Sequence, residues 1–303
     1  MKQSLSFQAT ILMASFIIAG SIGYAAYKKP DDRRVDKTIL SSKNQKVDDI
    51  DAEEILPENG VVLPAVWGDL GLRVTSVGVI DKAKFEEIYS SRGGLSEVER
   101  RLIEGSDNGN LVINSENSGL LLNLLWALGL GNKNIILENG PMTDSKYGGA
   151  GGFASTGGWT LSASDSMDHY SRHRFIVLTE EQQAMVERAA KNIYRPCCNN
   201  STYFPDCNHG MAMLGLLELM ASQGVSEEEM YKAALAVNSF WFPDTYLTIA
   251  KHMKSKGIDW KNVNAREVLG LNYSSGSGYA QLVERMKNTG GTDRRSGGGG
   301  CSV

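Results

Sequence analysis

The sequence predicts a mainly α-helical protein, a helical bundle in which one helix hairpin carries a site of cysteine and histidine residues. Three observations predict this class. Cap signals precede runs of apolar residues at helical spacing, two long stretches are apolar on nearly every face, and no stretch alternates convincingly like a half-buried strand. The 303 residues are 42% hydrophobic and 22% charged, which is ordinary for globular proteins of one or two domains.

The first 27 residues are predicted to be a membrane anchor or a signal segment. Residues 5–27 carry no charge and are long enough to cross a bilayer core of ~30 Å as a hydrophobic helix. Lys2 and the small residues Gly23 and Ala25 also fit a cleaved signal peptide, and a buried core helix is the third alternative. The basic residues after this segment favour a cytoplasmic body by the positive-inside rule. We nevertheless expect a membrane-anchored body on the extracytoplasmic face, because a short hydrophobic N-terminus before one large region usually directs export.

Three further parts follow this segment. Residues 28–60 are charged and poor in apolar side chains, which predicts a solvated stalk or linker. Residues 61–290 form the predicted helical body, and residues 291–303 are a flexible glycine-rich tail that carries Cys301. The net charge of −4 gives the protein no basic surplus, so we expect no nucleic acid partner.

Within the body, helices are expected after Ser96, Thr179 and Ser226, each of which is followed three residues later by Glu or Gln. Further helices are expected over residues 115–130, 209–223 and 244–256, with shorter ones over 265–269 and 278–287. Residues 147–161 contain six glycines without a phosphate-binding motif. They predict a long irregular segment, either a loop around the bundle or a lid over the cysteine site. Phe175–Leu178 is the best candidate for a short strand.

The side chains best suited to bind a metal or to exchange disulfides lie between residues 195 and 213. Three of the four cysteines, Cys197, Cys198 and Cys207, lie there, and His209 follows two residues after the third. Thiolate and imidazole are the ligands of Cu(I), zinc and iron–sulfur centres, and paired thiols also perform disulfide exchange. Copper or zinc is the expected metal, and an iron–sulfur cluster stays open as an alternative.

The local sequence predicts how these groups are presented. Pro196 and the polar residues 199–201 end the preceding helix and place the adjacent thiols in a turn. The adjacent thiols could close a strained disulfide with each other, or one of them could pair with Cys207. Asp206 is the expected N-cap of the next helix, where the macrodipole would lower the pKa of the Cys207 thiol. His209 could serve as a ligand or as a proton acceptor.

Several other residues are weaker candidates. Met211 and Met213 either fill the core or add thioether ligands. Cys301 is either incidental or a mobile thiol that reaches the cysteine site at an effective concentration near the millimolar range. His169 and His173 have the i, i+4 spacing of a helical metal pair or of a surface feature. No serine or cysteine protease signature is legible in the sequence. The aromatic stretch 238–243 either packs in the core or shields the thiols from water.

The order of adjacent cysteines, a third cysteine, an apolar helix and a second helix opened by Ser226 resembles the membrane-anchored helix-hairpin thiol proteins of bacterial cytochrome c maturation. It also resembles small extracytoplasmic metal-related proteins with a cysteine-rich turn before a helix hairpin. The resemblance covers residues 195–242. It implies a membrane-anchored helical domain that reduces partner thiols with two cysteines. Here Cys197 and Cys198 are adjacent, whereas two residues separate the cysteines of that family, and a third cysteine and His209 are added.

The sequence therefore predicts a membrane-associated, extracytoplasmic protein that binds or relays a soft metal through Cys197, Cys198, Cys207 and His209. The first alternative is a thiol–disulfide oxidoreductase in which Cys207 is the thiolate and Cys197 or Cys198 its partner. The second is a non-catalytic structural or self-assembling protein with a structural disulfide or zinc site. The expected partners are the membrane, through the N-terminal segment, and a protein that exchanges metal or thiols.

Overall fold

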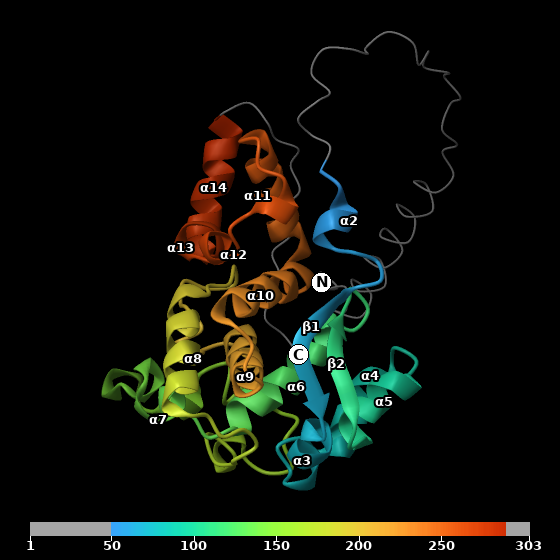
Figure 1. Ribbon diagram of the computed structural model, residues 1–303. Coiled ribbons are helices and arrows are strands. Elements are labelled where there is room, and N and C mark those ends of the chain that lie inside the picture. The colour runs from blue at the N-terminus through green and yellow to red at the C-terminus, as the bar shows by residue number, and fades with distance from the viewer. Residues whose placement is uncertain (1–49, 289–303) are drawn as a thin grey trace, which may run out of the picture. The chain divides into compact units, whose positions relative to one another are not determined.

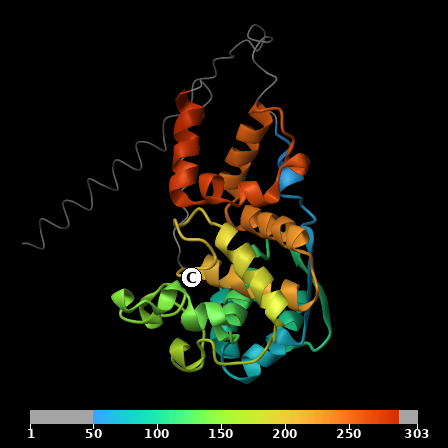
Figure 2. The same ribbon diagram turned by 60° about the vertical axis from the view of Figure 1, so that its left-hand side comes forward.

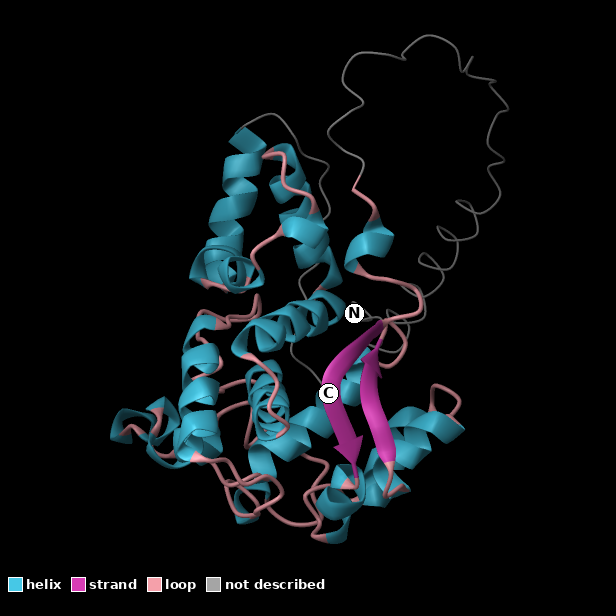
Figure 3. Ribbon diagram, in the orientation of Figure 1, coloured by secondary structure: helices cyan, strands magenta, loops and turns pink. Residues whose placement is uncertain are grey.

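The computed structural model describes residues 50–288, and in this range the protein is mainly helical, as predicted (Figures 1 and 3). Among these residues, no helix has both the length and the apolar character needed to cross a membrane. The predicted hydrophobic segment of residues 1–27 and the predicted glycine-rich tail with Cys301 lie outside the described residues.

The folded body begins earlier than the predicted boundary at residue 61. Helix α2 (Ala52–Ile55) starts at Asp51, whose side chain accepts a hydrogen bond from the Glu53 backbone N–H. Ile55 is buried, and α2 packs on α11 (Pro243–Ser255). Part of the predicted stalk, residues 50–60, therefore contains this short helix, and Ile55 packs it against the core together with the partly buried Ile50 and Leu56.

A two-stranded antiparallel sheet was not expected from the sequence. Strand β1 (Val61–Gly68) pairs with β2 (Asn108–Ile113), with an irregularity between Val62 and Val66. In β1 the side chains of Leu63, Ala65 and Trp67 are buried and alternate with less buried neighbours. Those outward-facing neighbours are also apolar, so the alternation was invisible in the sequence. The predicted strand Phe175–Leu178 does not form.

In the sequence, three helices follow β1 and precede β2. They are α3 (Leu70–Ser76), α4 (Lys82–Ser90) and α5 (Glu97–Glu104). Ser96 opens α5 with a complete capping box, in which its hydroxyl accepts from the Glu99 N–H and the Glu99 carboxylate accepts from the Ser96 N–H. This helix start is confirmed.

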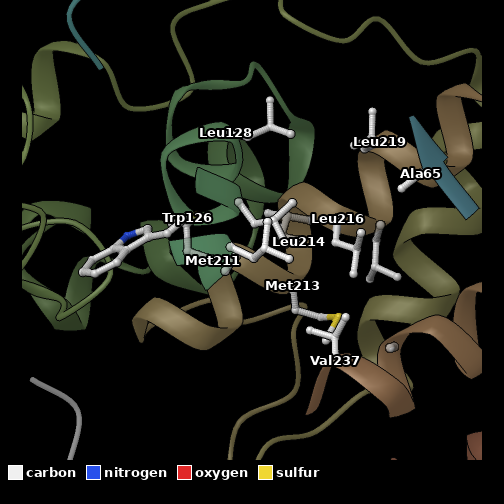
Figure 4. Close-up of a cluster of buried hydrophobic side chains, with 14 of the residues drawn as sticks. Ala65, Trp126, Leu128, Met211, Met213, Leu214, Leu216, Leu219 and Val237 are labelled. Carbon is white, nitrogen blue, oxygen red and sulfur yellow. The ribbon is translucent and has the colours of Figure 1, made fainter. Parts of the chain in front are cut away.

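The centre of the core is a close contact between α6 (Ser118–Gly131) and α9 (Asn208–Ser222), the two helices predicted to be buried. Glycine allows the approach. A Cβ at Gly129 would lie 2.1 Å from the Met211 carbonyl oxygen, and one at Gly215 would lie 2.6 Å from that of Leu125. Figure 4 shows the side chains of both helices meeting there, with Val237 of α10 beside Met213.

The remaining helices surround this pair. The capping boxes at Thr179 and Ser226 are confirmed and open α8 (Glu180–Asn192) and α10 (Glu227–Trp241). Helix α9 packs most extensively on α6, not on α10, which follows it in the chain. The others are α7 (Ile135–Asn139), α12 (Ala265–Val268), α13 (Leu271–Ser274) and α14 (Gly276–Asn288), and α11–α14 gather at one end of the described body (Figures 1 and 2).

The glycine-rich segment is irregular, as predicted, and contains short 3₁₀ turns at Ser145–Tyr147 and Ala150–Gly152. It is held at Ser155. The Trp126 Nε1 donates to the Ser155 carbonyl at 2.7 Å, and the Ser155 N–H donates to the Asp206 carbonyl at 3.1 Å. The segment therefore passes beside the turn that precedes α9.

Candidate functional site

The candidate site is the loop that joins α8 to α9. Near its start, Tyr194 and Ser201 form an isolated antiparallel bridge, and the Thr202 N–H donates to the Ile193 carbonyl at 2.8 Å. These contacts close the loop on itself. As a result, side chains from residues 195–198 meet those from residues 206–209 at the beginning of α9.

Two of the sulfur atoms lie close together beside the imidazole. Cys197 Sγ is 3.5 Å from Cys207 Sγ and 3.9 Å from His209 Nδ1. These three donor atoms all lie within 4.8 Å of one another, and Cys198, Asp206 and Cys207 form a second such group. The structure thus brings together three of the four predicted ligands in one group and places Cys198 in a second group that shares Cys207.

A buried arginine organises the site. The Arg195 side chain is 1% exposed, and its Nε donates to Cys207 Sγ at 3.0 Å. Its terminal nitrogens donate to the carbonyls of Asn200 and Phe204, both at 2.9 Å, and to Asp206 Oδ1 at 2.6 Å. One guanidinium therefore fixes both ends of the loop and places a positive charge against one thiol.

Neighbouring groups shift the pKa values of Cys207 and Cys198 in opposite directions. Hydrogen bonds from the Cys197 and Cys198 side chains and the charge of Arg195 hold the pKa of Cys207 well below its usual range, against the effect of burial. A hydrogen bond with Cys197 lowers the pKa of Cys198, but the hydrogen bond with Cys207 and burial outweigh it and raise that pKa to about 11. The surroundings therefore favour the thiolate form at Cys207 and the protonated thiol at Cys198.

The start of α9 differs from the prediction in one residue. Cys207, not Asp206, is the N-cap, and it makes no side-chain capping bond. The Asp206 carboxylate instead pairs with Arg195 and accepts from Asn200 Nδ2 at 2.8 Å. The buried guanidinium outcompetes the helix N-terminus for this carboxylate. The thiol still lies at the positive end of the helix dipole, as expected.

Aromatic rings cover the imidazole. The centroid of the His209 ring is 4.4 Å from that of Phe242 and 5.5 Å from that of Trp241. Both aromatic residues belong to the stretch 238–243, for which core packing and shielding were open alternatives. These two rings pack against the histidine of the site.

The start of α14 braces the turn that carries the adjacent cysteines. The Gly276 N–H donates to the Cys198 carbonyl at 2.8 Å, and the Ser277 N–H donates to Asn199 Oδ1 at 2.7 Å. Helices α9 and α14 therefore begin at the same loop. Their first residues, Asn208 and Gly276, are 68 residues apart in the sequence. This bracing had no local sequence signal.

The other candidate ligands lie elsewhere. Met211 and Met213 are fully buried in the hydrophobic core, as the core-filling alternative predicts (Figure 4). His169 and His173 do not lie on one helix: a 3₁₀ turn ends at Asp168, and the chain then reverses. Sequence reasoning missed Arg195, because an arginine at a helix end is ordinary until its burial is known.

Gly210 makes room for the guanidinium, and this gives a direct prediction. A Cβ at Gly210 would lie 2.5 Å from Arg195 Cζ and Nη2. We expect Gly210→Ala to displace the guanidinium, lower the free energy of unfolding by about 1–3 kcal/mol and raise the pKa of Cys207. Urea denaturation and thiolate absorbance against pH measure the two effects.

The matched control is Gly119→Ala in α6, where a Cβ would meet no heavy atom within 4 Å. The added methyl group there should leave stability unchanged or raise it by about 0.5–1 kcal/mol, because alanine is the better helix former. Equal stability and equal thiol titration in both variants would contradict the packing of Arg195 on Gly210.

Set against known proteins, the chain matches no family model, no curated protein and no solved structure.

Proposed function

We propose that this protein performs thiol–disulfide exchange with the dithiol of a partner protein, using Cys197 and Cys207. The observation that carries the proposal is the buried Arg195, whose Nε donates to Cys207 Sγ at 3.0 Å while Cys197 Sγ lies 3.5 Å from the same sulfur. A bond of ~2.05 Å between these sulfurs requires only a small approach. The stabilised thiolate and a neighbouring thiol are the two parts that exchange needs.

Exposure assigns the two cysteines different roles. Cys207 is 7% exposed, whereas Cys197 is less buried and can be reached from solvent. In the disulfide form, a partner thiolate attacks Cys197 Sγ, the bond between Cys197 and Cys207 breaks, and Cys207 leaves as the thiolate. A low pKa of the leaving thiol speeds this step and stabilises the reduced form.

The second thiolate of the partner completes the exchange. It attacks the partner sulfur of the mixed disulfide, and Cys197 departs with the electron pair. His209 Nδ1, 3.9 Å from Cys197 Sγ, is placed to protonate this sulfur. The partner loses two electrons and gains a disulfide, and this protein gains a dithiol. A body on the extracytoplasmic face, as predicted from residues 5–27, would meet an environment in which disulfides persist.

The experiment equilibrates the full chain with glutathione buffers and maps disulfides by mass spectrometry. We expect a reversible bond between Cys197 and Cys207 that Cys197→Ser abolishes. The matched control, Cys198→Ser, should retain it, because the variant leaves the 3.5 Å contact between Cys197 Sγ and Cys207 Sγ in place and its hydroxyl can still donate to Cys207. We also expect the thiolate absorbance of Cys207 to titrate below the ordinary thiol pKa of ~8.5. A Cys207 pKa at or above that value, with no bond to Cys197, would refute the proposal.

A specific observation also favours the predicted metal site. The donor atoms of Cys197, Cys207 and His209 all lie within 4.8 Å of one another, and two thiolates with one imidazole suit zinc or Cu(I). Elemental analysis of the purified full chain separates the two functions. A stoichiometric metal with reduced thiols supports this second function. A metal-free protein with a titratable disulfide supports the first.

A further inference from the structure

A chain of hydrogen bonds joins a serine to two histidines away from the cysteine site. Ser164 Oγ is 3.2 Å from His169 Nε2, and His169 Nδ1 is 3.0 Å from His173 Nε2. A single assignment of protons satisfies both contacts: Ser164 donates to His169 Nε2, and His169 donates from Nδ1 to His173 Nε2. This is the arrangement of a nucleophile, a base and a group that orients the base.

The backbone between the two histidines adopts an unusual conformation that brings their rings together. Ser171, between the two histidines, has a φ of 51° and is the one non-glycine residue with positive φ among residues 50–288. Such a conformation is uncommon for serine and is retained where surrounding contacts enforce it. The Ser171 N–H donates to the Leu130 carbonyl at 2.9 Å, and its hydroxyl accepts from the Asn134 N–H at 3.1 Å. The reversal at Ser171 turns the chain back so that the two rings meet, with centroids 5.3 Å apart.

The serine lies on the wall of a cavity. The cavity has a volume of about 420 Å³ and is lined by Gly151, Gly157, Trp159, Ser164 and Met167, among others. Ser164 is exposed, whereas His169 is 7% exposed. The hydroxyl therefore faces solvent from a wall in which the base is buried. A cavity of this size is in the range that holds small ligands.

The protonation of the histidines suits the same role. Burial lowers the pKa of His169, and burial and the neighbouring His169 lower the pKa of His173. Both rings are thus neutral near pH 7, and a neutral His169 can accept the serine proton. The backbone N–H groups of Ser164 and Asp165 have no hydrogen-bond acceptor among the described residues and leave two donors beside the hydroxyl.

We propose that Ser164 and His169 are the catalytic residues of a second site, one that cleaves uncharged carboxylic esters with small acyl groups, and that His173 positions His169. Ser164 Oγ bonds to the carbonyl carbon of the ester while its proton passes to His169 Nε2. The bond to the alcohol oxygen then breaks, and His169 returns the proton to the departing alcohol. Water attacks the acyl-serine in the same manner and releases the acid.

The lining of the cavity selects the substrate class. It contains the Asp165 carboxylate and neither lysine nor arginine, and the Lys84 ammonium that reaches the lining residue Ser162 is engaged with its carbonyl at 2.7 Å, so the lining disfavours an anionic ester. The glycines leave space, and Trp159 and Met167 provide apolar surface for a small acyl group. This site uses none of the cysteine residues, so it is independent of the function proposed above.

The test is labelling of the full chain with a fluorophosphonate, followed by peptide mapping. Here the serine oxygen bonds to phosphorus, fluoride leaves, and the proton passes to His169. We expect the label on Ser164, with labelling abolished in Ser164→Ala and slowed about 100-fold or more in His169→Asn. The matched control, Ser255→Ala, changes an exposed serine of α11 that does not line the cavity, and should label at the rate of the unaltered protein. Ser164 is exposed, so its alanine variant folds whether or not the site is functional.

Two further measurements complete the test. His173→Phe should slow labelling, and His173→Gln, whose amide oxygen can accept from His169, should restore much of the rate. Incubation with p-nitrophenyl acetate followed by acid should leave an acetyl group on Ser164. Label or acetyl on another residue, or equal labelling of Ser164→Ala and the unaltered protein, would overturn the proposal.

Discussion

Replacing Arg195 with methionine is expected to lower the free energy of unfolding by about 3–5 kcal/mol and to raise the pKa of Cys207. The guanidinium is 1% exposed and donates to Cys207 Sγ, to two carbonyls and to the Asp206 carboxylate. Removing it leaves the carboxylate and the two carbonyls without this donor, and the loss of one partner from a buried ion pair costs an amount of this order. Guanidinium chloride denaturation measures the first effect, and thiolate absorbance against pH measures the second.

The control is Arg188→Met in α8. Arg188 Nε pairs with Glu227 Oε2 at 3.1 Å, but its side chain is 57% exposed. An exposed ion pair contributes about 0–1 kcal/mol, so this variant should lose little stability and leave the titration of Cys207 unchanged. If both variants lose the same stability, the special role assigned to the buried guanidinium is wrong.

The second large effect is a dependence of stability on pH that originates at Glu218 in α9. Its side chain is fully buried, and Oε2 accepts from Asn132 Nδ2 at 2.9 Å. Burial raises the pKa of Glu218 to about 8, and the hydrogen bond from Asn132 opposes this rise only in part. The folded protein therefore holds this carboxyl in its neutral form at pH 7, whereas the unfolded chain ionises it near its ordinary pKa of 4.5.

The difference between the pKa of Glu218 in the folded and unfolded states determines how stability changes with pH. Below pH 4.5 both states are protonated at Glu218, and this group does not change stability with pH. Between pH 4.5 and about 8 the unfolded state loses the proton first, so stability falls as the pH rises, by about 5 kcal/mol in total. Above pH 8 both states are ionised, and the loss is complete.

Glu218→Gln should remove this loss, because glutamine has no proton to release. We expect the variant to gain stability over the unaltered protein as the pH rises from 5 to 9, measured by urea denaturation at each pH. The matched control is Glu284→Gln on the exposed face of α14, which should follow the unaltered protein throughout. A constant difference between the Glu218 variant and the unaltered protein at all pH values would contradict a buried, neutral carboxyl.

The parts of the fold that could be predicted from the sequence are those set by local chemistry. Ser96, Thr179 and Ser226 open helices because a hydroxyl and a carboxyl or amide three residues later satisfy each other and the backbone. The sheet could not be predicted, since Val62 and Val66 on the outer face of β1 are as apolar as the buried positions. Nor could α2 be predicted, because its place depends on contacts of Ile50, Ile55 and Leu56 with a core that is distant in the sequence.

Part of the candidate site could likewise be predicted from the sequence, and part could not. Clustering in the sequence was enough to bring Cys197, Cys207 and His209 together, because a short loop joins them. The role of Arg195 depends on the closure of that loop, and no pattern marks it. The hydrogen bonds that join Ser164, His169 and His173 depend on the backbone reversal at Ser171. There a serine takes a conformation that its residue type does not predict.

The position of the glycine-rich segment has a consequence for evolution. Gly151 and Gly157 line the cavity beside Ser164, and Ser155 between them donates its N–H to the carbonyl of Asp206, next to Cys207. A single stretch of polypeptide thus supports the surroundings of both candidate centres. An insertion or deletion there would disturb two chemistries at once, so its length is expected to be far more tightly conserved among homologues than its irregular backbone would suggest.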